Sequence, residues 1–251
     1  MYGLAVAAAL GPVVVHDSRE TSPLASVGSR PGTFAAEPVV YERTAGEWRQ
    51  WWLAYARNDQ DRGILRTGRH AGDWELIQVR LDGERPVEAV YAQHSGAERC
   101  PWSAVETRGG RPVVYVARGS HAAYFRPGVR DRTWPDPNDE ADGRGEVVVP
   151  AVEPLGGWRD WPGRWGRARR GWVPGEMDSP RGPAFQPDGR WSDPDAWARA
   201  ARPCTHRRCD EVGECDGGET AITLAAPLVA ALTVLGLLRR RSSRHAEHRE
   251  P

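Results

Sequence analysis

The chain has 251 residues, 39% of them hydrophobic, which is long enough and apolar enough for one substantial core. Its 34 basic residues, all arginine, are balanced by 34 acidic residues, so the net charge gives no support to nucleic-acid binding. With 28 glycines and 21 prolines, the sequence favours short strands and many turns.

The first quarter of the chain predicts short strands. Residues 1–11 form a mildly apolar run without a positively charged start or a cleavage site, and we interpret them as a degenerate or truncated N-terminal segment. Residues 12–16 and 39–41 are predicted strands, with a polar loop at 17–38. The aromatic residues at 48–55 fit a helical stripe or a two-sided buried strand, and we favour the strand, partly on the resemblance described below.

A charged lead-in precedes the clearest predicted strand, residues 73–81. Because alternate positions of a strand share a face, Asp73 and Glu75 point the same way as Ile77 and Val79. Unpaired carboxylates are costly to bury, so this pair needs a cation, an arginine or several hydrogen-bond donors. With His70 three residues earlier, we interpret the stretch as a divalent-metal site. The alternative is that arginines and backbone amides satisfy both carboxylates.

Two further histidines follow predicted strands. His94 comes after residues 87–93, and His121 follows the strand at 113–117. If these strand ends meet, they form a site of mixed oxygen and nitrogen ligands, to which both histidines could contribute. The carboxylates favour magnesium, manganese or calcium, whereas imidazole also admits zinc. The spacing of strands and turns predicts a mainly β fold, an antiparallel β-sandwich with long irregular loops over residues 12–200.

The segment at 158–197 holds six of the twelve tryptophans among glycine, proline and arginine. Such a composition is not compatible with long regular elements. We expect an irregular arm that packs its tryptophans on the sandwich. The alternative is an exposed aromatic patch that binds carbohydrate or lipid headgroups.

The C-terminal part predicts a membrane anchor. Residues 201–219 form a linker, and residues 220–238 contain 19 residues without a charge, which as a helix would span about 28 Å, close to the hydrocarbon thickness of a bilayer. The tail at 239–251 begins with three arginines, so the positive-inside tendency places it in the cytoplasm and the large domain outside the cell. A tail-anchored protein with a cytoplasmic domain is the competing topology.

Four cysteines give a second indication of an external domain. An even number of cysteines outside the cell favours two disulfides, for which three connectivities are possible. A small zinc site with His206 is the alternative, but the spacing matches no standard ligand pattern. The cysteines are Cys100, Cys204, Cys209 and Cys215.

Three ordered motifs resemble the vacuolar protein sorting-associated protein 62 family. They are His-Ala-Gly-Asp-Trp-Glu at 70–75, Tyr-Ala-Gln-His-Ser-Gly at 91–96, and Val-Tyr-Val-Ala-Arg-Gly-Ser-His-Ala-Ala-Tyr at 114–124. Shorter pieces at 164–166, 179–183 and 191–197 agree, so the resemblance covers roughly residues 12–197. That family has no settled biochemical activity, and the resemblance therefore implies a fold more than a function.

The same stretch is more distantly similar to the necrosis-inducing proteins, secreted β-sandwich cytolysins. Their heptapeptide Gly-His-Arg-His-Asp-Trp-Glu supplies a histidine, an aspartate and a glutamate to a divalent metal. The resemblance implies His70, Asp73 and Glu75 as ligands, with Asp59 as a further acidic ligand and Asp61 as second choice. This chain has Arg69 and Gly72 where the heptapeptide has glycine and its second histidine, and these departures put cytolytic activity in doubt.

Three functions fit these features. The first is a membrane-anchored extracellular binding module with a metal site, which recognises a glycan, a glycolipid or another envelope component. The second is an extracellular metal-dependent hydrolase, with His94 or His121 as general base. The third is a non-catalytic structural or sorting protein. We rank the binding module first and keep the other two as alternatives, so enzymatic activity stays open, and the sequence names neither the ligand nor the metal.

Overall fold

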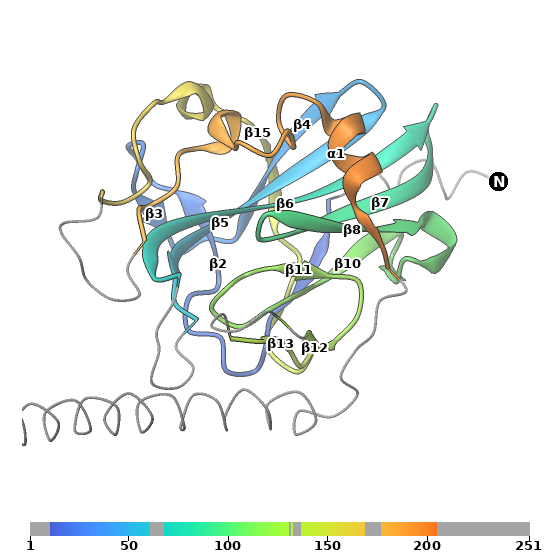
Figure 1. The fold of residues 1–251 in the computed structure, drawn as a ribbon, viewed down its shortest axis with the longest axis horizontal. Coiled ribbons are helices and arrows are strands. Elements are labelled where there is room, and N and C mark those ends of the chain that lie inside the picture. Colours follow the sequence, from blue (N-terminus) through green and yellow to red (C-terminus); the bar gives the residue numbers. More distant parts are fainter. Residues whose placement is uncertain (1–10, 61–67, 131, 133–136, 169–176, 205–251) are drawn as a thin grey trace, which may run out of the picture.

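The computed structural model of the chain describes residues 11–60, 68–130, 132, 137–168 and 177–204 (Figure 1). The predicted membrane helix at 220–238, the tail at 239–251, and Asp61, Cys209 and Cys215 lie outside these residues. Within them, no helix has the length and apolar character needed to cross a membrane. The membrane anchor therefore stays a prediction.

A large sheet dominates the part of the chain that the structure describes. Its strand order is β15-β4-β5-β6-β7-β8-β16, with β2 paired to β5 and β3 to β2. The strands are β2 (Leu24–Val27), β3 (Phe34–Ala35), β4 (Val39–Ala45), β5 (Trp48–Asn58), β6 (His70–Asp82), β7 (Arg85–Gln93), β8 (Gly96–Pro101), β15 (Ala151–Pro154) and β16 (Arg202–Pro203). The strands predicted at 48–55 and 73–81 are confirmed as parts of β5 and β6, the two longest strands.

A smaller sheet faces the large one, and a separate two-stranded ribbon of β12 and β13 lies beside it. The smaller sheet contains β1 (Val13–Val15), β9 (Thr107–Arg108), β10 (Arg111–Val116), β11 (Ala123–Tyr124) and β14 (Val147–Val148), and the ribbon contains β12 (Gly128–Arg130) and β13 (Asp139–Ala141). The predicted antiparallel pattern needs a correction, because β1 with β10, β4 with β15 and β8 with β16 pair in parallel. Each of these pairs joins strands far apart in sequence, which no hairpin constrains to be antiparallel.

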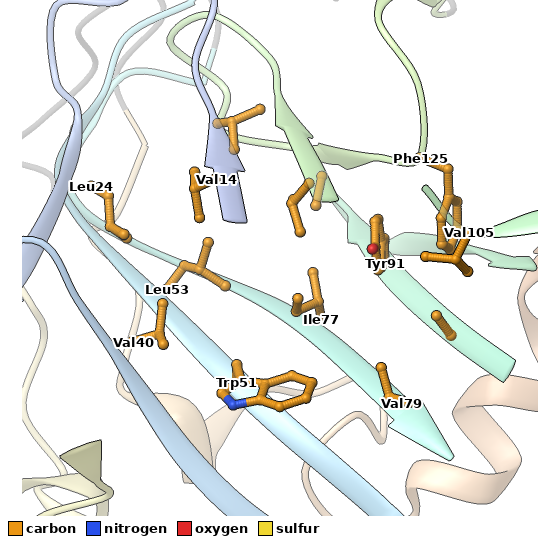
Figure 2. Packing of buried hydrophobic residues seen from close by; sticks show 14 of the residues in the cluster. Val14, Leu24, Val40, Trp51, Leu53, Ile77, Val79, Tyr91, Val105 and Phe125 are labelled. Atoms are coloured by element: carbon orange, nitrogen blue, oxygen red, sulfur yellow. The ribbon is translucent and has the colours of Figure 1, made fainter. Parts of the chain in front are cut away.

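The main hydrophobic core fills the space between the two sheets, so the predicted β-sandwich is confirmed for the described residues. Val14 and Val114 of the smaller sheet contribute to the same buried cluster as Leu53, Ile77 and Tyr91 of the large sheet. Figure 2 shows the side chains of Val14, Leu53, Ile77 and Tyr91, from both sheets, pointing into one layer. Because Ile77 is on the inner face of β6, the residues of equal parity before it, 73 and 75, also face inward.

Tryptophans of the arm cover the outer face of the large sheet, which lies between the arm and the smaller sheet in Figure 1. Trp165 is fully buried and contacts Trp74 edge-on at 4.9 Å between ring centroids. The same outer cluster includes Trp52, Trp158, Trp161, Trp191 and Trp197. In the part of the arm that the structure describes, the regular elements are short 3-10 turns and the helix α1 (Pro194–Ala200), whose N-terminus is capped by Asp193. The expected packing of tryptophans on the sandwich is confirmed for these residues.

The loop predicted at 17–38 is partly wrong, because it contains β2 and β3. Leu24 and Ala25 pair with Tyr55 and Ala54 of β5, a long-range contact that overrides the local turn-rich composition. Of the cysteines, Cys100 and Cys204 form a disulfide between β8 and the residue that follows β16.

Candidate functional site

A polar pocket of about 410 Å³ lies where β6 extends beyond the end of the β7–β8 hairpin. The pairing of β6 with β7 begins at Ile77 and Tyr91, so residues 70–75 have no β7 neighbour, and the hairpin turn at 94–95 leaves their side open. The arm supplies the opposite wall, which includes Met177 and Gln186. The pocket thus brings together residues that sequence analysis singled out and others that it missed, notably His70, Asp73, Glu75, His94, Ser120 and Arg190.

His70 is held in one tautomer. Its Nδ1 lies 2.7 Å from the carbonyl oxygen of Gly72, which can only accept, so Nδ1 carries the hydrogen. In the neutral ring, Nε2 then accepts from the amide nitrogen of Asn58 at 3.2 Å. A backbone carbonyl on Nδ1 is the arrangement that commonly orients a metal-binding histidine, and here the lone pair of Nε2 is used by the Asn58 amide.

Asp73 belongs to a buried chain of charges. Its Oδ2 accepts from Nδ1 of His121 at 2.9 Å, and Nε2 of that ring lies 3.8 Å from Oε1 of Glu20. Burial opposes the charge on His121, but the two carboxylates outweigh it and raise the pKa of the imidazole to about 9. The same contacts lower the pKa of Glu20 to about 2 despite its burial, and also lower that of Asp73. At neutral pH the three groups therefore form a carboxylate, imidazolium, carboxylate series.

Glu75 differs sharply from Asp73 although both face the same layer. Neither of its oxygens has a hydrogen bond among the described residues, and Oε2 is completely buried. Burial and the neighbouring negative charge of Asp73 raise the pKa of Glu75 well above its usual range, and Arg190 only partly opposes them. One side of the pocket thus carries an ionised carboxylate beside a carboxyl group that lacks a partner for its charge.

His94 is tied to a second buried carboxylate. Its Nε2 lies 2.7 Å from Oδ2 of Asp139, which also accepts from the hydroxyl group of Tyr124 at 2.6 Å. The other carboxylate oxygen, Oδ1, accepts from the hydroxyl group of Ser120 at 2.6 Å. Burial disfavours the charge on Asp139, but His94, Arg132 and Ser120 together lower its pKa below the usual range. Asp139 is therefore ionised, and its hydrogen bonds hold His94 and Ser120 in one wall of the pocket.

The backbone is strained at both of these histidines. Among the described residues other than glycine, positive φ values occur at His94, with 53°, and at His121, with 58°. The left-handed region is unfavourable for residues with a Cβ atom, and such strain tends to occur at functional positions. The predicted relevance of these two histidines thus has an independent structural indication.

Asp59, the further acidic ligand that the resemblance implies, is outside the pocket lining. Its Oδ2 lies 3.8 Å from Nε of Arg57 and 3.7 Å from Nε of Arg69. Within the described ranges, no three histidine, cysteine, aspartate or glutamate side chains are grouped so as to hold a metal ion by themselves. The structure therefore brings His70, Asp73 and Glu75 to one pocket without Asp59.

Several site residues escaped sequence analysis. Glu20 lies in a segment that reads as loop, and Asp139 follows a turn-rich stretch. Arg190 lies in the arm, far along the chain from β6. The Asn-Asp-Glu run at 138–140 is visible in the sequence, but the burial that makes its side chains need partners is seen only in the structure. No local pattern indicates which strand end these residues approach.

Part of the chain matches a known protein family. Residues 61–132 match the family model of vacuolar protein sorting-associated protein 62. The Vps62 match includes β6, β7, β8 and β10, and with them His70, Asp73, Glu75, His94 and His121. No curated protein matches the sequence.

Solved structures similar to the chain have the toxin fold of necrosis-inducing proteins. One is described as a toxin fold for microbial attack and plant defense, and another is NLPPya in complex with mannosamine. Each is 16% identical, with a TM-score of 0.41, over 74% of this chain and 88% of the other. The non-toxic HaNLP3 protein is 13% identical, with a TM-score of 0.36, over 59% and 73%. The family-model match confirms the first resemblance noted from the sequence over residues 61–132. The solved structures found include a protein titled Necrosis and Ethylene inducing Protein 2, from the family named as the more distant resemblance.

Proposed function

We propose that the domain is a binding module whose pocket takes a hydroxyl-rich ligand, a glycan or a glycolipid headgroup, with a divalent cation at Asp73 and Glu75. The observation that carries the proposal is the set of unpartnered acceptors in the pocket wall. Oε2 of Glu75 and Oδ1 of Asn58 are buried and lack a hydrogen bond among the described residues. Buried acceptors without partners are costly, so a bound cation or hydroxyl group would stabilise them.

The pocket's arginines do not fill this role, because their hydrogen bonds are made within the protein. Nη1 of Arg132 donates to Oε1 of Gln60 at 2.8 Å. Nη2 of Arg190 lies 2.5 Å from a carboxylate oxygen of Asp188 and 2.5 Å from the carbonyl oxygen of His94. These arginine groups thus already donate to protein oxygens, and the unpartnered acceptors of the pocket can bind a ligand that donates hydrogen bonds.

The chemistry of the donor set fits a divalent cation. Two carboxylates on one face of β6 suit magnesium, manganese or calcium, and Nε2 of His70, once released by the Asn58 amide, would extend the choice to manganese or zinc. A bound cation would supply positive charge between the carboxylates and attract ligand oxygens. Since the protein groups do not form a complete cation site alone, ligand hydroxyls or water would complete the coordination.

We place the module outside the cell, tethered by residues 220–238 with the tail at 239–251 in the cytoplasm. The support is the uncharged 19-residue run followed by arginines. The disulfide between Cys100 and Cys204 is of a kind that persists in oxidising compartments. A reporter that is active only in the cytoplasm should be active when fused after Arg244, and a reporter that is active only outside the cell should be inactive there.

Metal analysis and glycan binding test the proposal together. Wild-type protein should retain a divalent metal after dialysis and bind members of a glycan and glycolipid array in a chelator-sensitive way. Asp73→Asn and Glu75→Gln should lose both properties, whereas Asp82→Asn, an exposed carboxylate on the same strand, should lose neither. Equal metal content in all four proteins would contradict the cation, and turnover of an ester or glycoside substrate would favour the hydrolase instead.

A further inference from the structure

We propose that Asp139 fixes His94 as the tautomer protonated at Nε2, so that the lone pair of Nδ1 faces the pocket and accepts a hydrogen bond from a ligand hydroxyl. In this role His94 determines specificity and Asp139 is a positioning residue. The inference rests on the proposed function for the ligand, but the orientation of His94 rests on geometry alone.

The contacts of the ring leave little choice of tautomer. The Oδ2 atom of Asp139 is 2.7 Å from Nε2 of His94 and belongs to a fully buried carboxylate. Such a carboxylate accepts and does not donate, so the hydrogen of a neutral imidazole lies on Nε2. Nδ1 has no hydrogen-bond partner among the described residues. Because the side chain is a quarter exposed and lines the pocket, Nδ1 is open to a ligand.

Contacts also fix the backbone of His94. Nη2 of Arg190 donates to its carbonyl oxygen, and the guanidinium lies over the ring of Trp197 at 5.5 Å from the centroid. The turn that carries His94 joins β7 to β8 with only residues 94 and 95 between paired positions, and φ is 53° at His94. A two-residue hairpin turn with positive φ usually has glycine or asparagine there. Asp139, Arg190 and the hairpin together hold His94 in this strained conformation, which suggests that its imidazole is needed at this place.

The unpaired Nδ1 of His94 favours a ligand that donates a hydrogen bond. Together with Oδ1 of Asn58, which has no partner among the described residues, Nδ1 of His94 gives the pocket acceptors for a hydroxyl group. A sugar hydroxyl donates one hydrogen bond and can at the same time bind a cation through its oxygen. Removal of the hydroxyl that meets Nδ1 would leave this nitrogen without a partner, which is how a polar site rejects a deoxy analogue.

Long-range nitrogen-15 NMR of histidine-labelled protein tests the orientation without any ligand. The neutral form of wild-type His94 should show a protonated Nε2 and an unprotonated Nδ1, and Asp139→Asn should shift the population of this form toward Nδ1–H. Tyr124→Phe, which removes another hydrogen bond to Asp139, should leave the tautomer unchanged and so controls for loss of structure. A ring protonated at Nδ1 in wild-type protein would overturn the proposal.

Ligand binding tests the contact. For any glycan that binds the wild type, His94→Ala should weaken binding about tenfold to a hundredfold, as expected for one lost hydrogen bond of roughly 1.4 to 2.8 kcal/mol. His94→Gln, which keeps an acceptor, should recover part of the loss, and metal content should not change in either variant. Unchanged affinity in His94→Ala, or loss of metal equal to that in Asp73→Asn, would overturn the assignment. If no glycan binds the wild type, the proposed function and the ligand contact both fail, and the NMR result still decides the orientation.

Discussion

The imidazole of His121 stacks flat on the ring of Tyr55, with 3.9 Å between centroids and 6° between planes. The stacked ring is also the centre of the charge series from Glu20 to Asp73. A cation on an aromatic face is stabilised by the ring quadrupole, and here both groups are shielded from water. The arrangement makes a charged histidine part of the core beneath the pocket.

The charge on His121 should make stability depend on pH. Its pKa is about 9 in the folded protein against 6.5 for an ordinary histidine. A raised pKa gives stability that is complete below pH 6.5 and is lost as the pH rises through 9, an effect of roughly 3 kcal/mol. Urea unfolding in chelator at pH 6, 7.5 and 9.5 should show this loss for the wild type. In His121→Gln the loss between pH 6 and 9.5 should be much smaller, and an equal loss in both proteins would contradict the assignment.

Glu75 should be a source of instability when no cation is bound. Because its pKa is raised in the folded protein, its contribution to stability decreases as the pH rises above the ordinary value of 4.5. Glu75→Gln keeps the shape and removes this cost, so the variant should unfold at a higher temperature than the wild type at pH 8 in chelator. Addition of manganese should raise the melting temperature of the wild type and not of the variant. A variant less stable than the wild type in chelator would show that the charge on Glu75 has a partner.

Gly72 should not tolerate a side chain. It has a φ of 67°, and a Cβ atom there would lie 1.9 Å from the carbonyl oxygen of Trp165. Gly72→Ala should therefore cost more than the 1–2 kcal/mol, roughly, of a left-handed alanine. Gly83→Ala is the matched control, since Gly83 has a φ of 63° and open space around it. Chemical denaturation of both variants should give the larger loss for Gly72→Ala, and equal losses would mean that the arm moves aside easily.

The same contact lies at a position where the sequence departs from the heptapeptide that it resembles. That peptide has histidine at the position of Gly72, whereas here the backbone of Trp165 occupies the space. The sequence shows the glycine but cannot show what lies against it, because the arm is nearly one hundred residues further along. The departure that put cytolytic activity in doubt is thus linked to the packing of the arm on β6.

Local patterns predicted the parts of the fold that depend on neighbouring residues. Alternation placed Asp73 and Glu75 on the inner face with Ile77. The aromatic run at 48–55 is a buried strand, but its local pattern also fitted a helix, and the family resemblance helped to favour the strand. Local patterns could not predict contacts between residues far apart in the sequence, such as the parallel pairing of β1 with β10 and the approach of Asp139 to His94. Spacing along the chain also could not decide whether Asp59 reaches the pocket, because that depends on the path between β5 and β6.

The disulfide should contribute strongly to stability. Cys100 is buried in the main core, and its bond to Cys204 closes a segment with a sequence separation of 104 residues. Closing a loop of this length restricts the unfolded chain by about 4.7 kcal/mol in the chain-entropy model. The double variant Cys100→Ala and Cys204→Ala should therefore unfold at a lower urea concentration than the oxidised wild type, and reduced wild type should behave like the variant. Equal midpoints for oxidised and reduced wild type would show that the bond constrains a segment already ordered in the unfolded ensemble.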